Sequence, residues 1–148
     1  MGIKFETPYD LEREYIFAKY IESKFDCILY KLDASYSIDF GCIKNNKLVC
    51  WVELKRRKNS SKAYPTYMLN NYKLCRGLSL SEHTQIPFIL AVEFTDSRLW
   101  VNCNEVSKTN PALRFMSKRK KRVEDDAEPM TLIPMKYFKS FKHPMYCL

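Results

Sequence analysis

The chain has 148 residues, of which 46% are hydrophobic and 14% aromatic, so it should fold around a core rather than remain disordered. Its 25 lysines and arginines against 17 acidic residues give a formal charge of +8, which favours a polyanionic partner, with nucleic acid ahead of an anionic membrane surface. It has three glycines and no GxGxxG or GxxxxGK[ST] pattern, which argues against nucleotide binding through a glycine-rich loop.

No segment of the sequence looks like a membrane span or a secretion signal. The apolar runs fall well short of the roughly 18–20 residues that a spanning helix needs. The residues after Met1 also lack the apolar stretch of a signal peptide. We therefore expect a cytoplasmic protein without a membrane partner.

The six cysteines raise the question of disulfides or a zinc site. None forms a CxxC pair, and neither His83 nor His143 stands at a zinc-finger spacing. Cys42, Cys50 and Cys103 lie inside apolar runs, where a free thiol behaves as a small hydrophobic group. We expect buried free thiols.

The first half of the chain predicts a helix followed by strands. Residues 8–25 have apolar positions at helical spacing, with Thr7 as the expected N-cap and Pro8 at the first helical position. Strands are predicted over residues 27–32, 35–43 and 47–54. The last two should form a hairpin around the turn Asn45-Asn46.

The second half continues the alternation of helix and strand. A basic connection leads to a helix predicted over residues 64–80, and two more strands follow over residues 86–95 and 98–103. The order is helix, three strands, helix, two strands, which predicts a mixed α/β fold with a β-sheet flanked by helices. We expect one domain over residues 1–148, with its core at about 8–103.

The last part of the chain, residues 104–148, is predicted to be a basic C-terminal extension. Its cationic run 118–122 is followed at once by the acidic stretch 124–128, a charge block typical of a solvated loop or hairpin tip. Residues 130–135 should add an edge strand, because Pro134 cannot donate a ladder hydrogen bond.

Residues with catalytic potential gather on the predicted hairpin. Asp39 lies on its first strand, while Glu53 and Lys55 lie two positions apart at the end of its second strand and so share a face of the sheet. Two carboxylates suit Mg²⁺, for which Mn²⁺ would substitute, and the carbonyl of Leu54 would add a third hard oxygen. An ammonium group beside them would orient the attacking water or stabilise charge on a phosphate. The pattern therefore predicts a metal-dependent centre that hydrolyses phosphodiesters.

This arrangement resembles the PD-(D/E)XK nuclease superfamily, which has the restriction-endonuclease-like fold. The motif of that superfamily is an acidic residue on one strand and (D/E)-x-K on the next. Here Asp39 and Glu53-Leu54-Lys55 match it, with Ile38 in place of the proline. The resemblance implies a mixed β-sheet in the order α-β-β-β-α-β-β, followed by the C-terminal extension.

The resemblance extends to the first helix, where LEREYI is similar to a run found in archaeal Holliday-junction resolvases. By that similarity Glu12 is the helical carboxylate that faces the metal and joins the catalytic set, with Glu14 as the second choice. Lys73 falls where related phage and resolvase-like nucleases place a basic residue, and the resemblance implies that it binds DNA. Nucleases of this fold often dimerise to cut both strands, so a homodimer is a further expectation.

Two basic segments are predicted to bind DNA phosphates. The residues of these segments are Arg56, Arg57 and Lys58 directly after the motif, and Lys118, Arg119, Lys120, Lys121 and Arg122 in the extension. Contacts of this kind position DNA without reading its sequence. The alternative for the first segment is a solubilising loop, and for the second a tip neutralised by the adjacent acids.

The site residues also have purely structural explanations. Asp39 fits a polar position on a half-exposed strand, and Glu53 with Lys55 fits a surface ion pair of little energetic weight. The macrodipole alone favours an acid such as Glu12 at a helix start.

The leading hypothesis is a metal-dependent DNA endonuclease of phage type, acting in the host cytoplasm, structure-directed or of low sequence specificity. One alternative is a non-catalytic nucleic-acid-binding protein on the same fold. Another is an interaction protein whose acidic partner meets residues 118–122. Divalent-ion-dependent cleavage that requires Asp39 and Lys55 would distinguish the first hypothesis from the other two.

Overall fold

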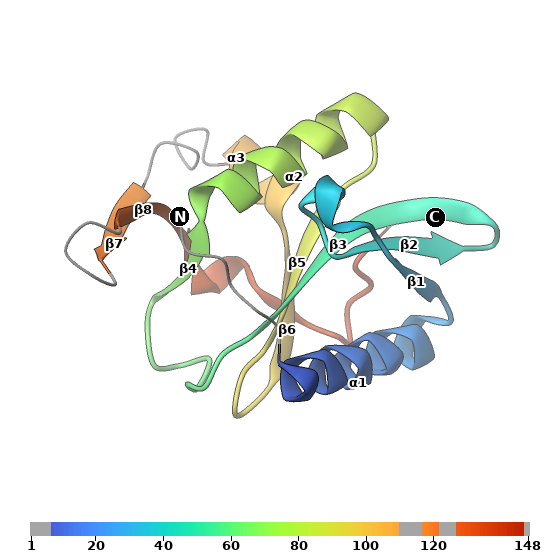
Figure 1. The fold of residues 1–148 in the computed structure, drawn as a ribbon, viewed down its shortest axis with the longest axis horizontal. Helices are drawn as coiled ribbons and strands as arrows, with labels where there is room; N and C mark the ends of the chain where they lie inside the picture. The colour runs from blue at the N-terminus through green and yellow to red at the C-terminus, as the bar shows by residue number, and fades with distance from the viewer. Residues whose placement is uncertain (1–6, 110–116, 122–126, 147–148) are drawn as a thin grey trace.

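A computed structural model describes residues 7–109, 117–121 and 127–146, and within these ranges the chain forms two β-sheets (Figure 1). The helices are α1 (Pro8–Phe25), α2 (Asn71–Thr84) and α3 (Cys103–Thr109). The larger sheet has the order β1 (Ile28–Lys31), β2 (Phe40–Lys44), β3 (Lys47–Arg56), β5 (Phe88–Glu93), β6 (Arg98–Asn102) and β9 (Lys139–Ser140). The smaller sheet has the order β4 (Thr66–Asn70), β8 (Ala127–Pro134) and β7 (Ser117–Lys121).

The larger sheet separates α1 on one face from α2 and α3 on the other (Figure 1). Its central strand β5 pairs in parallel with β3 and antiparallel with β6. Ile89 and Ala91 pack in the core cluster on the α1 side, whereas Phe88, Leu90 and Val92 pack with α2 and α3. This alternation explains the continuously apolar sequence of β5, because a strand covered on both faces has no solvated side.

The helix predicted over residues 8–25 is confirmed. Thr7 caps α1 through a capping box, in which its hydroxyl accepts from the amide of Asp10 at 3.1 Å and its own amide donates to the Asp10 carboxylate at 3.2 Å. The predicted hairpin turn is also confirmed, since Asn45 and Asn46 adopt φ of 52° and 62° between β2 and β3. Such left-handed angles suit asparagine in tight hairpin turns.

The strand predicted over residues 35–43 is wrong in its first half. Residues Ala34–Tyr36 form a 3₁₀ turn, which begins with Asp33 accepting a hydrogen bond from the amide of Ser35 at 3.0 Å. Ser37 has a left-handed φ of 60°, so the chain turns before β2 starts. Asp39 therefore precedes the strand instead of lying on it.

The helix predicted over residues 64–80 starts too early. Residues Thr66–Asn70 form β4, in which Tyr67 and Leu69 are buried and their neighbours are half-exposed. The helix α2 begins only after Asn70, whose side chain accepts from the amide of Tyr72 at 2.9 Å. The aromatic and aliphatic residues of this segment fit the spacing of a strand as well as that of a helix. The N-cap at Asn70 decides between the two, because it places the start of the helix after residue 70.

Residues 130–135 lie largely on a strand, as predicted, but not on an edge strand. β8 lies between β4 and β7 in the smaller sheet, and Pro134 occupies its last position. The chain after β8 returns to the larger sheet. Phe141 and Met145 are buried there against α1, with the Phe141 ring packed edge-on to Phe17 at a centroid distance of 6.0 Å.

One close approach fixes the distance between α2 and β5. A Cβ placed on Gly77 would lie 2.3 Å from the ring of Phe88, which is fully buried. Only a residue without a side chain allows the helix to pack at this distance.

The described cysteines are free, as predicted. Cys27, Cys42, Cys50 and Cys103 are buried, and Cys75 is half-buried. Among the described residues, no helix is both long and apolar enough to cross a membrane.

Candidate active site

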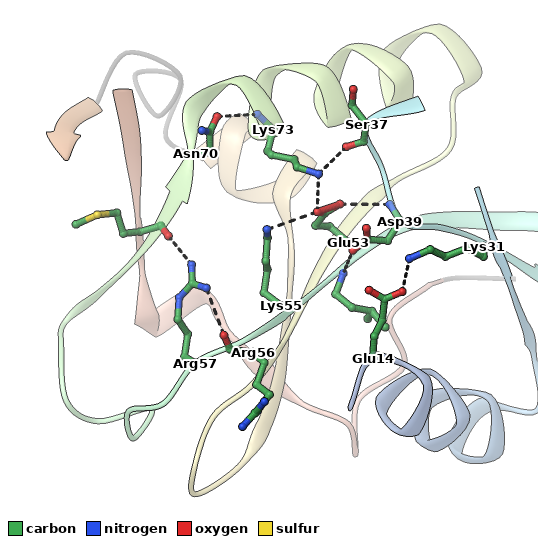
Figure 2. A network of polar contacts seen from close by, with 12 residues as sticks. Glu14, Lys31, Ser37, Asp39, Glu53, Lys55, Arg56, Arg57, Asn70 and Lys73 are labelled. Carbon is green, nitrogen blue, oxygen red and sulfur yellow. Dashed lines mark hydrogen bonds and ion pairs between the residues drawn. The ribbon is translucent and has the colours of Figure 1, made fainter. Parts of the chain in front are cut away.

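The predicted acidic residues meet where the ladder between β2 and β3 ends (Figure 2). The last pair of that ladder is Phe40 with Val52, and β3 continues beside β5 alone. The amide of Trp51 donates toward the β5 side, so the amide of Leu54 points to the opposite side. That amide donates to Oδ2 of Asp39 at 3.0 Å. The side chain of Asp39 thus takes the place of the missing strand.

Glu53 is held against Asp39 by a second hydrogen bond. The amide of Asp39 donates to Oε2 of Glu53 at 3.3 Å, while the Asp39 carboxylate binds the residue after Glu53. The side chain of Glu53 is only 1% exposed. The two carboxylates are therefore positioned by the backbone of each other's segment.

Two lysines face the other oxygen of Glu53. Nζ of Lys73 lies 2.9 Å from Oε1 of Glu53, and Nζ of Lys55 lies 3.8 Å from the same atom (Figure 2). Lys73 also donates to the carbonyl of Ser37 at 3.1 Å, which ties α2 to the turn before Asp39. Lys73, predicted to bind DNA from the sequence, thus lies inside the carboxylate cluster.

The electrostatics of the cluster are dominated by burial. Burial raises the pKa of Glu53 from 4.5 to about 7, and the charge of Asp39 adds to the effect, against the opposing charges of Lys73 and Lys55. Burial also lowers the pKa of Lys55, although Glu53 and Asp39 oppose that change. Both shifts favour the neutral forms of the two side chains.

The carboxylate of α1 that lines this site is that of Glu14, the second choice of the sequence, so we propose Glu14 in place of Glu12 as the helical carboxylate. A cavity of about 430 Å³ is lined by Asp39, Glu53 and Glu14, together with both lysines. Glu12 is exposed and does not line it. Because each helical residue turns by about 100°, positions 12 and 14 point roughly 200° apart and only one can face the cavity. Glu14 is ion-paired with Lys31 of β1.

The oxygen donors of the cavity suit a hard divalent cation. Asp39 and Glu53 supply carboxylates, and the carbonyl of Leu54 shares the side of β3 on which its amide binds Asp39. Repulsion from Asp39 is the second cause of the raised pKa of Glu53, and a dication would relieve it. Within the described ranges, no three His, Cys, Asp or Glu side chains form a ready-made metal site. The residues present fit Mg²⁺, which often binds one or two carboxylates and completes its shell with water and phosphate.

The basic segment after the motif borders the same cavity. Arg56, Arg57 and Lys58 all line it. Arg57 is partly committed to β4, because it donates to the carbonyl of Met68 at 3.1 Å and its guanidinium lies 4.6 Å from the ring centre of Tyr67. Arg56 and Lys58 are exposed and so are better placed to meet a ligand.

The second basic run lies mostly outside the described part of the structure. The backbone of residues 118–121 belongs to β7 and pairs with β8. The side chains of these residues, and Arg122 as a whole, lie outside that part, as do residues 124–126 of the acidic stretch.

Sequence reasoning missed Arg13 and Glu93, which line the cavity, and Arg98, which donates to Glu93. Glu93 is 7% exposed, and its carboxylate accepts from Arg13 and Arg98 at 2.7 and 2.9 Å. A signal for Glu93 was present, because it is a single acid at the end of the apolar run 88–92. Glu53 gave the same kind of signal in its own strand.

The structure has a mixed sheet flanked by helices, two hydrogen-bonded carboxylates where a strand loses its neighbour, and a lysine two positions after the second carboxylate. Together these features define the restriction-endonuclease-like fold of PD-(D/E)XK nucleases. The chain belongs to a phage endonuclease family of this class. The family model described as "Phage putative PDDEXK endonuclease" matches residues 2–141. Membership supports nuclease function.

The comparison with solved structures supports this fold through one match with a TM-score above 0.5. Hjc, a Holliday junction resolvase from the archaeal hyperthermophile Archaeoglobus fulgidus, is similar with a TM-score of 0.52 at 9% identity, over 82% of each chain. D212, a nuclease from a fusselovirus, has a TM-score of 0.48 at 13% identity, over 89% of this chain and 82% of its own. A search of curated proteins found no match.

Proposed function

We propose that this chain is a metal-dependent endonuclease that hydrolyses phosphodiester bonds in DNA, with a preference set by DNA structure or with low sequence specificity. The observation that carries the proposal is the hydrogen-bonded pair of Asp39 and Glu53 with Lys55 and Lys73 at one carboxylate oxygen. The match to a PDDEXK endonuclease family supports the reaction class.

The proposed cofactor is Mg²⁺, with Mn²⁺ as a substitute. Asp39, Glu53 and the carbonyl of Leu54 would hold it, and Glu14 lines the same cavity from α1. Bound there, a divalent ion would supply Lewis-acid chemistry, polarising the phosphate and making water more acidic.

The two lysines have different roles in this proposal. Lys55 is the less tightly paired, at 3.8 Å from Glu53, and its ammonium group is free to donate to a phosphate oxygen or to the attacking water. Lys73 lies 2.9 Å from the same oxygen and keeps the carboxylate of Glu53 in place. Lys73 therefore acts on the reaction through Glu53.

The exposed cations at the mouth of the cavity would guide the substrate. Arg56 and Lys58 border the cavity and carry charge toward a phosphate backbone. The formal charge of +8 would attract DNA from a distance, with an affinity that falls steeply as salt rises.

The test is cleavage of a supercoiled plasmid with Mg²⁺, Mn²⁺ or EDTA. We expect nicking with either metal and none in EDTA, and a loss on the order of 100-fold or more in Asp39→Asn and Lys55→Met. Lys47→Met, at the far end of the same strand, is the matched control and should cut normally. Normal rates in both site variants would show that the site is wrong.

A DNA-binding measurement at several salt concentrations, made beside the cleavage assay, decides between this proposal and the alternatives. Salt-dependent DNA binding without cleavage by any divalent ion would favour a non-catalytic nucleic-acid-binding protein. Negligible DNA binding at physiological salt would favour the protein-interaction role.

Branched DNA is the proposed preferred substrate, because one neighbour in fold is named as a Holliday junction resolvase. Comparing rates on a four-way junction and on a linear duplex of the same sequence tests this preference. Symmetric cutting of a junction requires two active sites, so we also propose a homodimer, which sedimentation of the junction complex would reveal.

A further inference from the structure

A second cavity, of about 590 Å³, adjoins the catalytic one and is unusually rich in cations. It is lined by Arg13, Arg56, Arg57, Lys58 and Arg98 around a single acid, Glu93. All of these except Arg98 also line the catalytic cavity, so the two spaces share a wall. Five cations around one carboxylate leave this cavity with a net charge of +4.

Glu93 gathers three of the arginines. Oε1 accepts from Nη2 of Arg13 at 2.7 Å, Oε2 accepts from Nε of Arg98 at 2.9 Å, and Nε of Arg56 lies 4.0 Å from Oε1. One carboxylate neutralises a single positive charge, and Arg13 and Arg98 already donate to its two oxygens. The third guanidinium and the two remaining cations exceed what Glu93 needs.

Aromatic rings contact two of the three arginines. The guanidinium of Arg98 lies 4.3 Å from the ring centre of Tyr20, and that of Arg56 lies 5.1 Å from the ring centre of Tyr9. A guanidinium group already held by such contacts loses less conformational entropy on binding a ligand, which favours binding of an anion.

Arg13 keeps a donor that the described residues do not use. Its Nε is buried and has no hydrogen-bond partner among them, although the same side chain binds Glu93 through Nη2. A buried N–H without an acceptor is unfavourable. A ligand with several oxygens in the adjoining cavity would remove both this deficit and the surplus positive charge.

We propose that this arginine cluster, Arg13, Arg56 and Arg98 around Glu93, binds an internal phosphate of the DNA strand that is cut. This inference rests on the function proposed above and adds a phosphate subsite to it. Glu93 lies opposite Arg56 in the parallel register of β3 and β5, three positions beyond Glu53. That offset is roughly 10 Å along the strands, so the subsite would receive a phosphate that neighbours the scissile one.

The experiment measures binding without cleavage, in EDTA, by fluorescence anisotropy of a labelled duplex from 50 mM to 500 mM salt. The variants are Arg98→Gln and Arg13→Gln, and Lys47→Gln is the control on an exposed lysine at the far end of β3. For each arginine variant we expect roughly tenfold weaker binding at 100 mM salt and a salt slope smaller by about one. Lys47→Gln should match the wild type.

Affinities and slopes equal to those of the wild type in both arginine variants would overturn the proposal. If Arg98→Gln fails to fold, Arg13→Gln carries the test, together with Arg98→Lys, which keeps the charge and should keep the salt slope. A terminal phosphate is the other source of the same chemistry. A defect seen with a 5′-phosphorylated duplex but not with a 5′-hydroxyl duplex or a closed circle would overturn binding of an internal phosphate.

Because the assay contains no metal, it separates this proposal from the proposed function. If the wild type nicks plasmid and the arginine variants keep the wild-type salt slope of DNA binding, the phosphate subsite is rejected and the nuclease function is kept. Absence of nicking by the wild type with reduced slopes in the variants would reject the nuclease and keep the phosphate site.

Discussion

Replacing Glu53 with glutamine should make the metal-free protein more stable at pH 8. The side chain of Glu53 is 1% exposed, and its pKa is raised from 4.5 to about 7, first by burial and then by Asp39. A carboxylate whose pKa is raised on folding destabilises the folded state wherever it is ionised. Glutamine resembles the neutral form of the side chain and removes that penalty.

The sign and size of the effect follow from linkage. Between pH 4.5 and pH 7 the folded state binds more protons at Glu53 than the unfolded state, so the free energy of unfolding falls as pH rises through this window. A shift from 4.5 to about 7 corresponds to about 3 kcal/mol at 1.36 kcal/mol per pKa unit. We therefore expect the free energy of unfolding of Glu53→Gln to exceed that of the wild type by about 2–3 kcal/mol at pH 8 and to match it near pH 4.5.

Urea denaturation in EDTA at pH 5, 6.5 and 8 measures this difference. Added Mg²⁺ should raise the midpoint of the wild type but not that of Glu53→Gln, because binding to the folded state alone stabilises it. A variant that is less stable than the wild type at pH 8 would refute the reasoning, since it would mean that the ion pairs with the two lysines outweigh desolvation.

Glu93→Gln is the matched control and should change stability in the opposite direction. Burial alone would raise the pKa of Glu93, but hydrogen bonds from Arg13 and Arg98 outweigh it and hold the pKa below 4.5. Its charge therefore stabilises the fold above pH 4.5, and that contribution disappears as pH falls through the lowered pKa. We expect the free energy of unfolding of Glu93→Gln to be about 1–3 kcal/mol lower than that of the wild type at pH 8.

The remaining predictions concern packing and the site. Gly77→Ala should lower the free energy of unfolding by about 1–3 kcal/mol in urea denaturation, despite the better helix propensity of alanine, because its Cβ would meet Phe88 at 2.3 Å. Adding Phe88→Leu should recover part of this loss, and an unchanged midpoint in Gly77→Ala would contradict the close approach. Lys73→Met should slow single-turnover nicking roughly tenfold to a hundredfold with little change in DNA affinity, and a selective loss of affinity would instead indicate a DNA contact. Glu14→Gln should slow nicking while Glu12→Gln does not, and the reverse order would restore the original assignment.

The part of the site that sequence could predict is the part carried by local periodicity. Glu53 and Lys55 share a face because strand residues alternate, and Asp39 lies across the hairpin that the Asn45-Asn46 turn closes, in a register shifted by one residue between Cys42 and Ile43. These relations extend over a few residues of one hairpin. The sequence therefore indicates them without knowledge of the rest of the fold.

The site residues that the sequence placed wrongly or gave another role lie on helices far along the chain from the hairpin. Whether Glu14 or Glu12 faces the cavity depends on how α1 is rotated about its axis against the sheet. The sequence of the helix does not determine that rotation, because the two glutamates are two positions apart and point to opposite sides. The position of Lys73 depends on where α2 begins, and the helix starts at residue 71 because β4 occupies the residues before it. Strand β4 in turn depends on a partner, β8, about sixty residues later in the chain.

Glu53 and Glu93 lie on adjacent strands, and their opposite surroundings bear on what the two cavities can hold. At Glu53, two ammonium groups do not offset burial and the neighbouring Asp39, so the pKa stays raised and a further cation would be bound favourably. At Glu93, the arginines more than offset burial, so the pKa is lowered and cations remain in excess for an anion. A metal ion in one cavity and a phosphate in the other would each correct the imbalance next to it. Because the two cavities share a wall, a DNA strand crossing that wall would meet both at once.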